Sequence, residues 1–209
     1  MGQNSDDLEH VYGAASPEES RQAYDKWSSN YDEDNLSNGF WLPMLAAGCL
    51  ARHIGQESGP LLDAGCGTGL VGKSLAIMGY GPITGCDLSP EMVGVAEKTG
   101  AYSGFEIANM GESLPFADDA FAGFSCIGSF GPGHAPPTSL IHLARVIRPG
   151  GIGVFNLIEA SYDEQGFPPI MDELTKTKKW RMREKSPAFP AFLLSEPDLL
   201  TRIYVVEML

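Results

Sequence analysis

The 209-residue chain is long enough for one well-buried domain and short for two. It carries 14 Lys and Arg against 27 Asp and Glu, a formal net charge of -13. This charge argues against a nucleic-acid partner and against binding to anionic membranes. No apolar run approaches the roughly 20 residues of a membrane span, and no signal peptide opens the chain. We therefore expect a soluble cytoplasmic protein, with a monomer as the default oligomeric state.

The first predicted element is a helix near the N-terminus. Residues 1–15 lack periodicity, and we expect them to be disordered. Ser16 and Pro17 then provide an N-cap and a first helical residue, which predicts a helix to about Asn30. It carries an aromatic stripe, Tyr24, Trp27 and Tyr31, which either packs the helix onto the domain or covers a ligand as a lid. With a second helix over 40–54, these lid helices occupy 16–55 of a single domain over 16–209.

A glycine-rich stretch follows a short apolar strand and admits three interpretations. Gly65-x-Gly67-x-Gly69 is the glycine loop of S-adenosylmethionine enzymes. Gly67-x-Gly69-x-x-Gly72 satisfies the dinucleotide fingerprint, and Gly67-x-x-x-x-Gly72-Lys73-Ser74 satisfies the P-loop pattern. All three describe a strand that turns into a helix, with glycines where the backbone approaches a ligand.

The charge around this loop favours a cationic ligand over a phosphate. Asp63 ends the strand, so we expect its carboxylate near the mouth of the loop, where it would repel phosphates and suit a sulfonium. It could instead merely cap the loop. Lys73 falls inside the predicted helix, and the strand Phe121–Ile127 does not end in a magnesium-holding acid. These features argue against the P-loop interpretation.

A second strand, Ile83–Asp87, ends in a carboxylate about 20 residues after the glycines, where an acid can accept hydrogen bonds from both ribose hydroxyls. A plain turn acid is the alternative. Ser89 and Pro90 then begin the next helix as N-cap and first residue. Ribose binding alone does not separate a nicotinamide cofactor from S-adenosylmethionine.

Four segments in order resemble the motifs of class I S-adenosylmethionine-dependent methyltransferases: 63–69, 87–92, 112–121 and 144–151. Segments 128–136 and 162–167 also resemble the subfamily of the small methyltransferase encoded in the Williams-Beuren syndrome region. The resemblance implies an α/β fold, a doubly wound, seven-stranded, mostly parallel Rossmann-like sheet with N-terminal cap helices. The implied cofactor is S-adenosylmethionine, and the implied product is S-adenosylhomocysteine.

The resemblance also implies a set of cofactor-binding residues: Tyr24, Trp27, Tyr31, Asp63, Gly65, Cys66, Gly67, Gly69, Asp87, Leu88, Ser89, Met92, Met110, Gly111 and Ile127. Within this set, Asp87 takes the ribose, while Leu88 and Met92 lie against the adenine. The family often places an acid for the adenine amino group after the third strand, but this chain has Met110 there. Met92 and Met110 could also be ordinary core residues.

The loop over 128–137, after the fourth strand, contains the candidate catalytic residue, His134. An imidazole can act as a general base near neutral pH. The alternatives are that His134 caps the helix beginning near Pro137, or simply packs. An acceptor that is a thiolate or a deprotonated amine needs no base, because alignment of donor and acceptor supplies much of the rate.

The remaining chain predicts no separate substrate domain. Residues 162–176 form an interrupted helix, 180–185 and 202–208 form an antiparallel strand pair, and 186–198 either wall the acceptor pocket or simply connect the strands. The four cysteines are scattered without a C-x-x-C pair, so we expect neither a metal site nor disulfides: Cys49, Cys66, Cys86 and Cys126.

The predicted function is methyl transfer to an O, N or S atom of a small molecule. The alternative is an S-adenosylmethionine-binding protein that acts through a partner without transfer.

Overall fold

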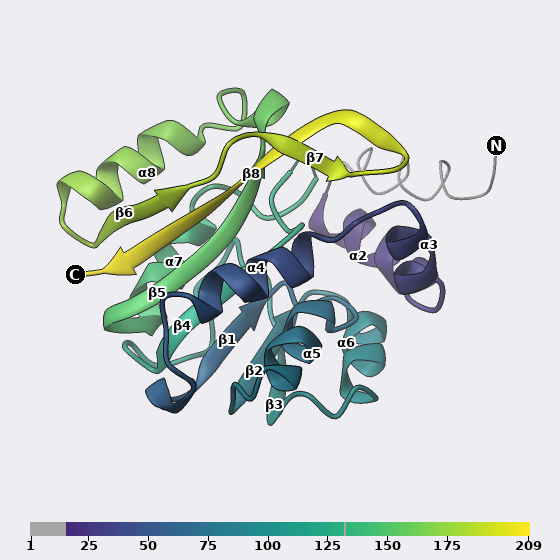
Figure 1. Ribbon diagram of the computed structural model, residues 1–209, viewed down its shortest axis with the longest axis horizontal. Helices are drawn as coiled ribbons and strands as arrows, with labels where there is room; N and C mark the ends of the chain where they lie inside the picture. The colour runs from purple at the N-terminus through teal and green to yellow at the C-terminus, as the bar shows by residue number, and fades with distance from the viewer. Residues whose placement is uncertain (1–15, 132) are drawn as a thin grey trace.

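The computed structural model describes residues 16–131 and 133–209, so the expectation for residues 1–15 lies outside the described part. A twisted central sheet carries helices on both faces, and the N-terminal helices lie beside one end of it (Figure 1). No helix in the described ranges is long and apolar enough to span a membrane.

The sheet follows the path β3-β2-β1-β4-β5-β8-β6, and the short strand β7 pairs with β8 off this path. The strands from β3 to β5 are parallel, whereas β8 runs antiparallel to β5, β6 and β7. The predicted doubly wound, mostly parallel sheet is therefore confirmed, with β7 as an addition to the seven strands expected. The strand bounds are β1 Leu61–Ala64, β2 Ile83–Asp87, β3 Gly104–Ile107, β4 Phe121–Cys126, β5 Ile147–Ile158, β6 Trp180–Lys185, β7 Phe189–Phe192 and β8 Glu196–Met208.

Apolar side chains cover both faces of the sheet, because successive residues of a strand point to opposite faces. In β1, Leu61 packs in the cluster that includes α4 (Leu42–Ala51) and α5 (Leu70–Ile77), while Leu62 packs in the cluster of α7 and α8. Both leucines are almost completely buried. All four residues of β1 are buried, and Asp63 is the one polar residue among them. The helices of the second face are α7 Ser139–Val146 and α8 Phe167–Lys176.

The N-terminal region forms two helices rather than the single helix expected. Ser16 caps α2 (Pro17–Trp27), as predicted, by accepting a hydrogen bond from the Glu19 N–H. The helix ends before Asn30, whose N–H bonds to the Trp27 carbonyl three residues back, and the Ser28 hydroxyl bonds to the Asp25 carbonyl. Tyr31 consequently begins α3 (Tyr31–Ser37).

The segment 186–198 does not wall the candidate pocket. Its strand β7 pairs with β8, and the ring of Phe192 stacks on Phe40 with centroids 5.1 Å apart. The Leu193 N–H also donates to the Gly39 carbonyl. This segment therefore connects the terminal strands and supports the region before α4.

Candidate active site

One cavity lies at the carboxyl ends of the parallel strands, where open α/β sheets bind their ligands. Its empty volume is about 770 Å³, including space that is open to solvent. Helix α2 and Tyr31 close one side, and the loops after β1, β2, β3 and β4 form the remainder. Its lining residues are Pro17, Ser20, Arg21, Tyr24, Tyr31, Gly65, Gly67, Asp87, Leu88, Ser89, Met92, Ala108, Asn109, Met110, Ile127, Gly128, Ser129, Gly133, His134, Ala135 and Pro136.

The glycine loop takes a backbone path that favours glycine. Gly65, Gly67 and Gly69 have φ angles of 66°, 51° and 92°, in the left-handed region that other residues rarely adopt. A Cβ on Gly65 would lie 2.1 Å from the Ser129 Oγ, so no side chain fits there. A Cβ on Gly67 would meet no atom within 4 Å, so its backbone is open to a ligand.

The carboxylate of Asp87 joins two of the pocket loops. Its Oδ2 accepts the Gly67 N–H at 2.8 Å, and its Oδ1 accepts the Ser89 N–H at 2.9 Å. Burial raises the pKa of this carboxyl above its ordinary value, and these backbone donors oppose the rise. Each carboxylate oxygen has two acceptor positions, so Asp87 retains capacity to accept hydrogen bonds from a ligand in the cavity.

Asp63 does not face the mouth of the loop, contrary to expectation. It is 1% exposed, and its two oxygens accept hydrogen bonds from Tyr102 Oη at 2.6 Å and Ser125 Oγ at 2.8 Å. Burial raises the pKa of its carboxyl, while these hydroxyls act in the opposite direction. Asp63 therefore fastens β1 to β4 and to the loop before β3, beneath the pocket.

His134 lies in the cavity and contacts the lid helix. Tyr24 Oη and His134 Nε2 are 2.8 Å apart, and the two rings pack edge to face with centroids 5.7 Å apart. This contact joins α2 to the loop after β4. The placement is compatible with a general base, because the same imidazole lines the cavity.

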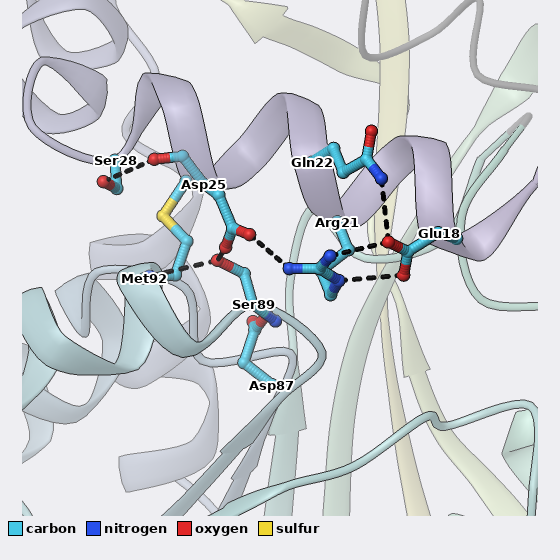
Figure 2. Close-up of polar contacts among 8 residues, drawn as sticks. All are labelled: Glu18, Arg21, Gln22, Asp25, Ser28, Asp87, Ser89 and Met92. Atoms are coloured by element: carbon cyan, nitrogen blue, oxygen red, sulfur yellow. Dashed lines mark hydrogen bonds and ion pairs between the residues drawn. The ribbon is translucent and has the colours of Figure 1, made fainter.

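Two further contacts hold the N-terminal helices to the cofactor-side loops. The Ser89 hydroxyl donates to Asp25 Oδ1 of α2 at 2.5 Å (Figure 2). The Thr68 hydroxyl of the glycine loop donates to Asp32 Oδ1 of α3 at 2.5 Å. These contacts and the Tyr24–His134 pair place polar groups of α2 and α3 against three different loops.

The structure brings most of the predicted residues together at this cavity: Tyr24, Tyr31, Gly65, Gly67, Asp87, Leu88, Ser89, Met92, Met110, Ile127 and His134. It does not place Trp27, Asp63, Cys66, Gly69 or Gly111 in the lining. Trp27 is 4% exposed, and its indole N–H donates to Asp34, so it fastens α2 to α3. Gly69 caps α5 and lies against α6 (Pro90–Glu97).

Sequence reasoning missed Arg21, which lines the cavity, and Tyr102, which supports Asp63. The helical periodicity could have found Arg21, since it lies one turn before Tyr24 on α2. Tyr102 follows a helix end without any recognisable motif. Across the described ranges, no three His, Cys, Asp or Glu side chains gather as a metal site requires.

Comparison with known proteins places this architecture in a family. A family described as "Methyltransferase domain" matches residues 61–151, which include the glycine loop and Asp87. The chain is 31% identical over 195 residues to the ubiquinone/menaquinone biosynthesis C-methyltransferase UbiE of Bdellovibrio bacteriovorus, covering 83% of this chain and 82% of that protein. The chain belongs to the class I S-adenosylmethionine-dependent methyltransferases. Its cofactor is S-adenosylmethionine.

One further relative and one solved structure are similar to this chain. It is 33% identical over 132 residues to human methyltransferase-like protein 27, a match that spans 62% of this chain but only 54% of that protein. In fold, it resembles the [4+2]-cyclase SpnF, with a TM-score of 0.69, 18% identity and coverage of 93% and 97% of the two chains. The second likeness concerns the fold alone.

The cavity suits the family's cofactor. The open backbone at Gly67 admits a ligand, and Asp87 offers carboxylate oxygens to ribose hydroxyls. The apolar side chains of Leu88, Met92 and Met110 line the same cavity, as an adenine ring requires.

Proposed function

We propose that this methyltransferase transfers the methyl group of S-adenosylmethionine to a small-molecule acceptor and releases S-adenosylhomocysteine. The observation that carries the proposal is a single cavity that joins Asp87 and the glycine loop to His134. Donor and acceptor can therefore lie in one space, and holding them in line contributes much of the rate of such reactions. We keep the expectation of a cytoplasmic monomer that acts on a metabolite.

On the cofactor side, we assign ribose binding to Asp87 and contact with the adenine to Leu88, Met92 and Met110. The bound cofactor supplies an electrophilic methyl group. Two backbone N–H donors hold the Asp87 carboxylate in place before the ligand arrives. Such preorganisation reduces the entropy lost on binding.

On the acceptor side, we assign the wall formed by Tyr24, Tyr31, His134 and Pro136. These rings line the cavity and suit a flat, partly apolar acceptor. The name of the relative from Bdellovibrio bacteriovorus refers to C-methylation in ubiquinone and menaquinone biosynthesis. This name supports a small cyclic acceptor. It also means that the acceptor atom can be a carbon, in addition to the O, N or S atom expected from the sequence.

We assign His134 as the group that removes a proton when the acceptor atom carries one. The proton would pass from the acceptor atom to the imidazole and then to solvent, and the acceptor atom would thereby be free to take the methyl group that the cofactor supplies. Tyr24 is hydrogen-bonded to His134 Nε2 and orients the ring. An acceptor that is already deprotonated needs no such step.

The test is transfer of label from methyl-labelled S-adenosylmethionine into a deproteinised metabolite extract. The proposal predicts a labelled small molecule and S-adenosylhomocysteine in equal amounts. Protein that binds the cofactor but labels no metabolite in extracts of its own cells would favour the non-catalytic alternative. A control with boiled protein identifies spontaneous methylation.

A further inference from the structure

A chain of polar contacts runs from the exposed edge of α2 to the ribose side of the cavity. On α2, Glu18, Arg21 and Asp25 lie about one turn apart along one face, as Figure 2 shows. The Arg21 Nε and Nη2 donate to the two oxygens of Glu18 at 2.9 and 2.6 Å. Its Nη1 donates to Asp25 Oδ2. The two-point contact with Glu18 fixes the guanidinium, which in turn holds one oxygen of the Asp25 carboxylate in place.

The second oxygen of Asp25 faces the loop after β2. This oxygen, Oδ1, accepts a hydrogen bond from the Ser89 hydroxyl, with the two oxygens 2.5 Å apart. A hydroxyl has one proton, so this bond leaves only lone pairs for other partners of Ser89. One of these lone pairs accepts the Met92 N–H at 3.1 Å and caps α6. Ser89 is 1% exposed, so both bonds lie away from water.

Ser89 in turn contacts Asp87, the residue that we propose binds the ribose. Its backbone N–H donates to Asp87 Oδ1 at 2.9 Å. Loss of the hydrogen bond between the Ser89 hydroxyl and Asp25 therefore shifts the Ser89 backbone N–H, which donates to Asp87. Asp25 does not line the cavity, whereas Ser89 and Asp87 do.

We propose that Asp25 is a positioning residue for ribose recognition: through Ser89 it sets the orientation of the Asp87 carboxylate. This inference rests on the proposed function, since it requires the ribose to bind Asp87. The linkage is reciprocal, because a ribose that stabilises the orientation of Asp87 also stabilises the docking of α2. Helix α2 is thereby part of the cofactor site without touching the ribose.

The test compares two ligands by calorimetric titration: S-adenosylhomocysteine and its 2′,3′-dideoxy analogue. For Asp25→Ala we expect roughly tenfold weaker binding of S-adenosylhomocysteine, the size of effect of one hydrogen bond to a charged group. We expect little change for the analogue, which lacks the hydroxyls that Asp87 binds. A merely structural role of Asp25 would weaken both ligands equally, and that result would overturn the inference.

A double-mutant cycle tests the route through Ser89. The losses in Asp25→Ala and Ser89→Ala should not add in the double variant, because both remove the same hydrogen bond. Additive losses would overturn the inference. Glu33→Gln removes a negative charge from the exposed surface of α3 and should bind both ligands as the wild type does.

Two outcomes complete the test. If Asp25→Ala does not fold, Asp25→Asn, which keeps the size of the side chain but removes its charge, gives the same comparison, with weaker binding of S-adenosylhomocysteine and unchanged binding of the analogue. Wild-type protein that bound no S-adenosylhomocysteine would refute the proposed function, and the inference with it. Wild-type binding that is unaffected by Asp25→Ala would overturn the inference alone.

Discussion

At the scale of single residues, the main result concerns the buried acid beneath the glycine loop. Asp63 satisfies its oxygens within the protein, through Tyr102 and Ser125. A buried carboxylate is costly unless it is hydrogen-bonded, so these two hydroxyls are part of the stability of the fold. Asp87 instead keeps access to the cavity. Two acids at the ends of adjacent strands thus have different roles.

Tyr102→Phe should lower the free energy of unfolding at pH 7 by about 1–3 kcal/mol, because Asp63 then loses one donor. Tyr204→Phe is the matched control: Tyr204 is also buried, and its ring stacks on Phe155. We expect a smaller loss there. Urea unfolding followed by circular dichroism measures both variants. Equal losses would mean that the bond to Asp63 contributes nothing specific.

The hydrogen-bonded pair of Tyr102 and Asp63 also predicts that the free energy of unfolding decreases at alkaline pH. Burial raises the pKa of the Tyr102 hydroxyl well above its ordinary value of 10.0 in the folded state. Below pH 10 the phenol is neutral in both states, and its contribution to stability is complete. Above pH 10 the unfolded state ionises first, so wild type should lose up to about 1.4 kcal/mol per pH unit relative to Tyr102→Phe. Parallel stability curves between pH 9 and 11 would contradict this.

His134→Asn should lower the rate of methyl transfer to a hydroxyl acceptor by roughly 100-fold or more, because general-base catalysis contributes about that much. The affinity for S-adenosylmethionine should change little. Single-turnover rates with the acceptor found in the extract assay, together with calorimetry, separate the two effects. An unchanged rate would assign His134 a packing role.

At the scale of elements, glycine positions report how closely the helices pack. A Cβ on Gly72 of α5 would lie 2.2 Å from the Tyr102 ring, whereas a Cβ on Gly94 of α6 would meet nothing within 4 Å. Gly72→Ala should therefore destabilise the protein by about 1–3 kcal/mol through overpacking. Gly94→Ala should stabilise it by about 0.5–1 kcal/mol through helix propensity. Thermal unfolding tests both, and a destabilised Gly94→Ala would contradict the packing described for α6.

The sequence predicted those elements whose ends carry local signals. The Ser-Pro pairs at Ser16 and Ser89 marked the starts of α2 and α6, since an N-cap and a fixed φ act within one turn. The end of α2 was not predictable, because no glycine or proline directly follows Trp27 to stop the helix. Likewise, β7 depends on pairing with β8, which no local pattern encodes.

At the site, motif residues were predictable, but their contacts were not. Gly65, Gly67 and Asp87 line the cavity, whereas Gly69 does not. Asp63 and Trp27 also belong to recognisable sequence patterns, yet both are buried away from the cavity. Asp63 is hydrogen-bonded to Tyr102, and Trp27 is hydrogen-bonded to Asp34. Such partners come from tertiary packing, which the spacing of residues in one chain does not reveal.

At the scale of the whole molecule, the fold narrows the function without defining the reaction. The chain shares its fold with a [4+2]-cyclase as well as with methyltransferases. The reaction therefore depends on the cavity, which Asp87 and the glycine loop line together with Tyr24 and His134. The central claim is that Asp87 in this cavity binds the ribose of S-adenosylmethionine.

Calorimetric titration of the wild type, Asp87→Ala and Glu91→Ala tests this claim most directly. The ligands are S-adenosylmethionine, S-adenosylhomocysteine, NAD and ATP. We predict binding of the first two alone, at least about tenfold weaker in Asp87→Ala. Glu91→Ala, which removes an exposed acid on α6, should leave binding unchanged. Binding of NAD or ATP in place of S-adenosylmethionine, or equal affinity in Asp87→Ala, would contradict the claim.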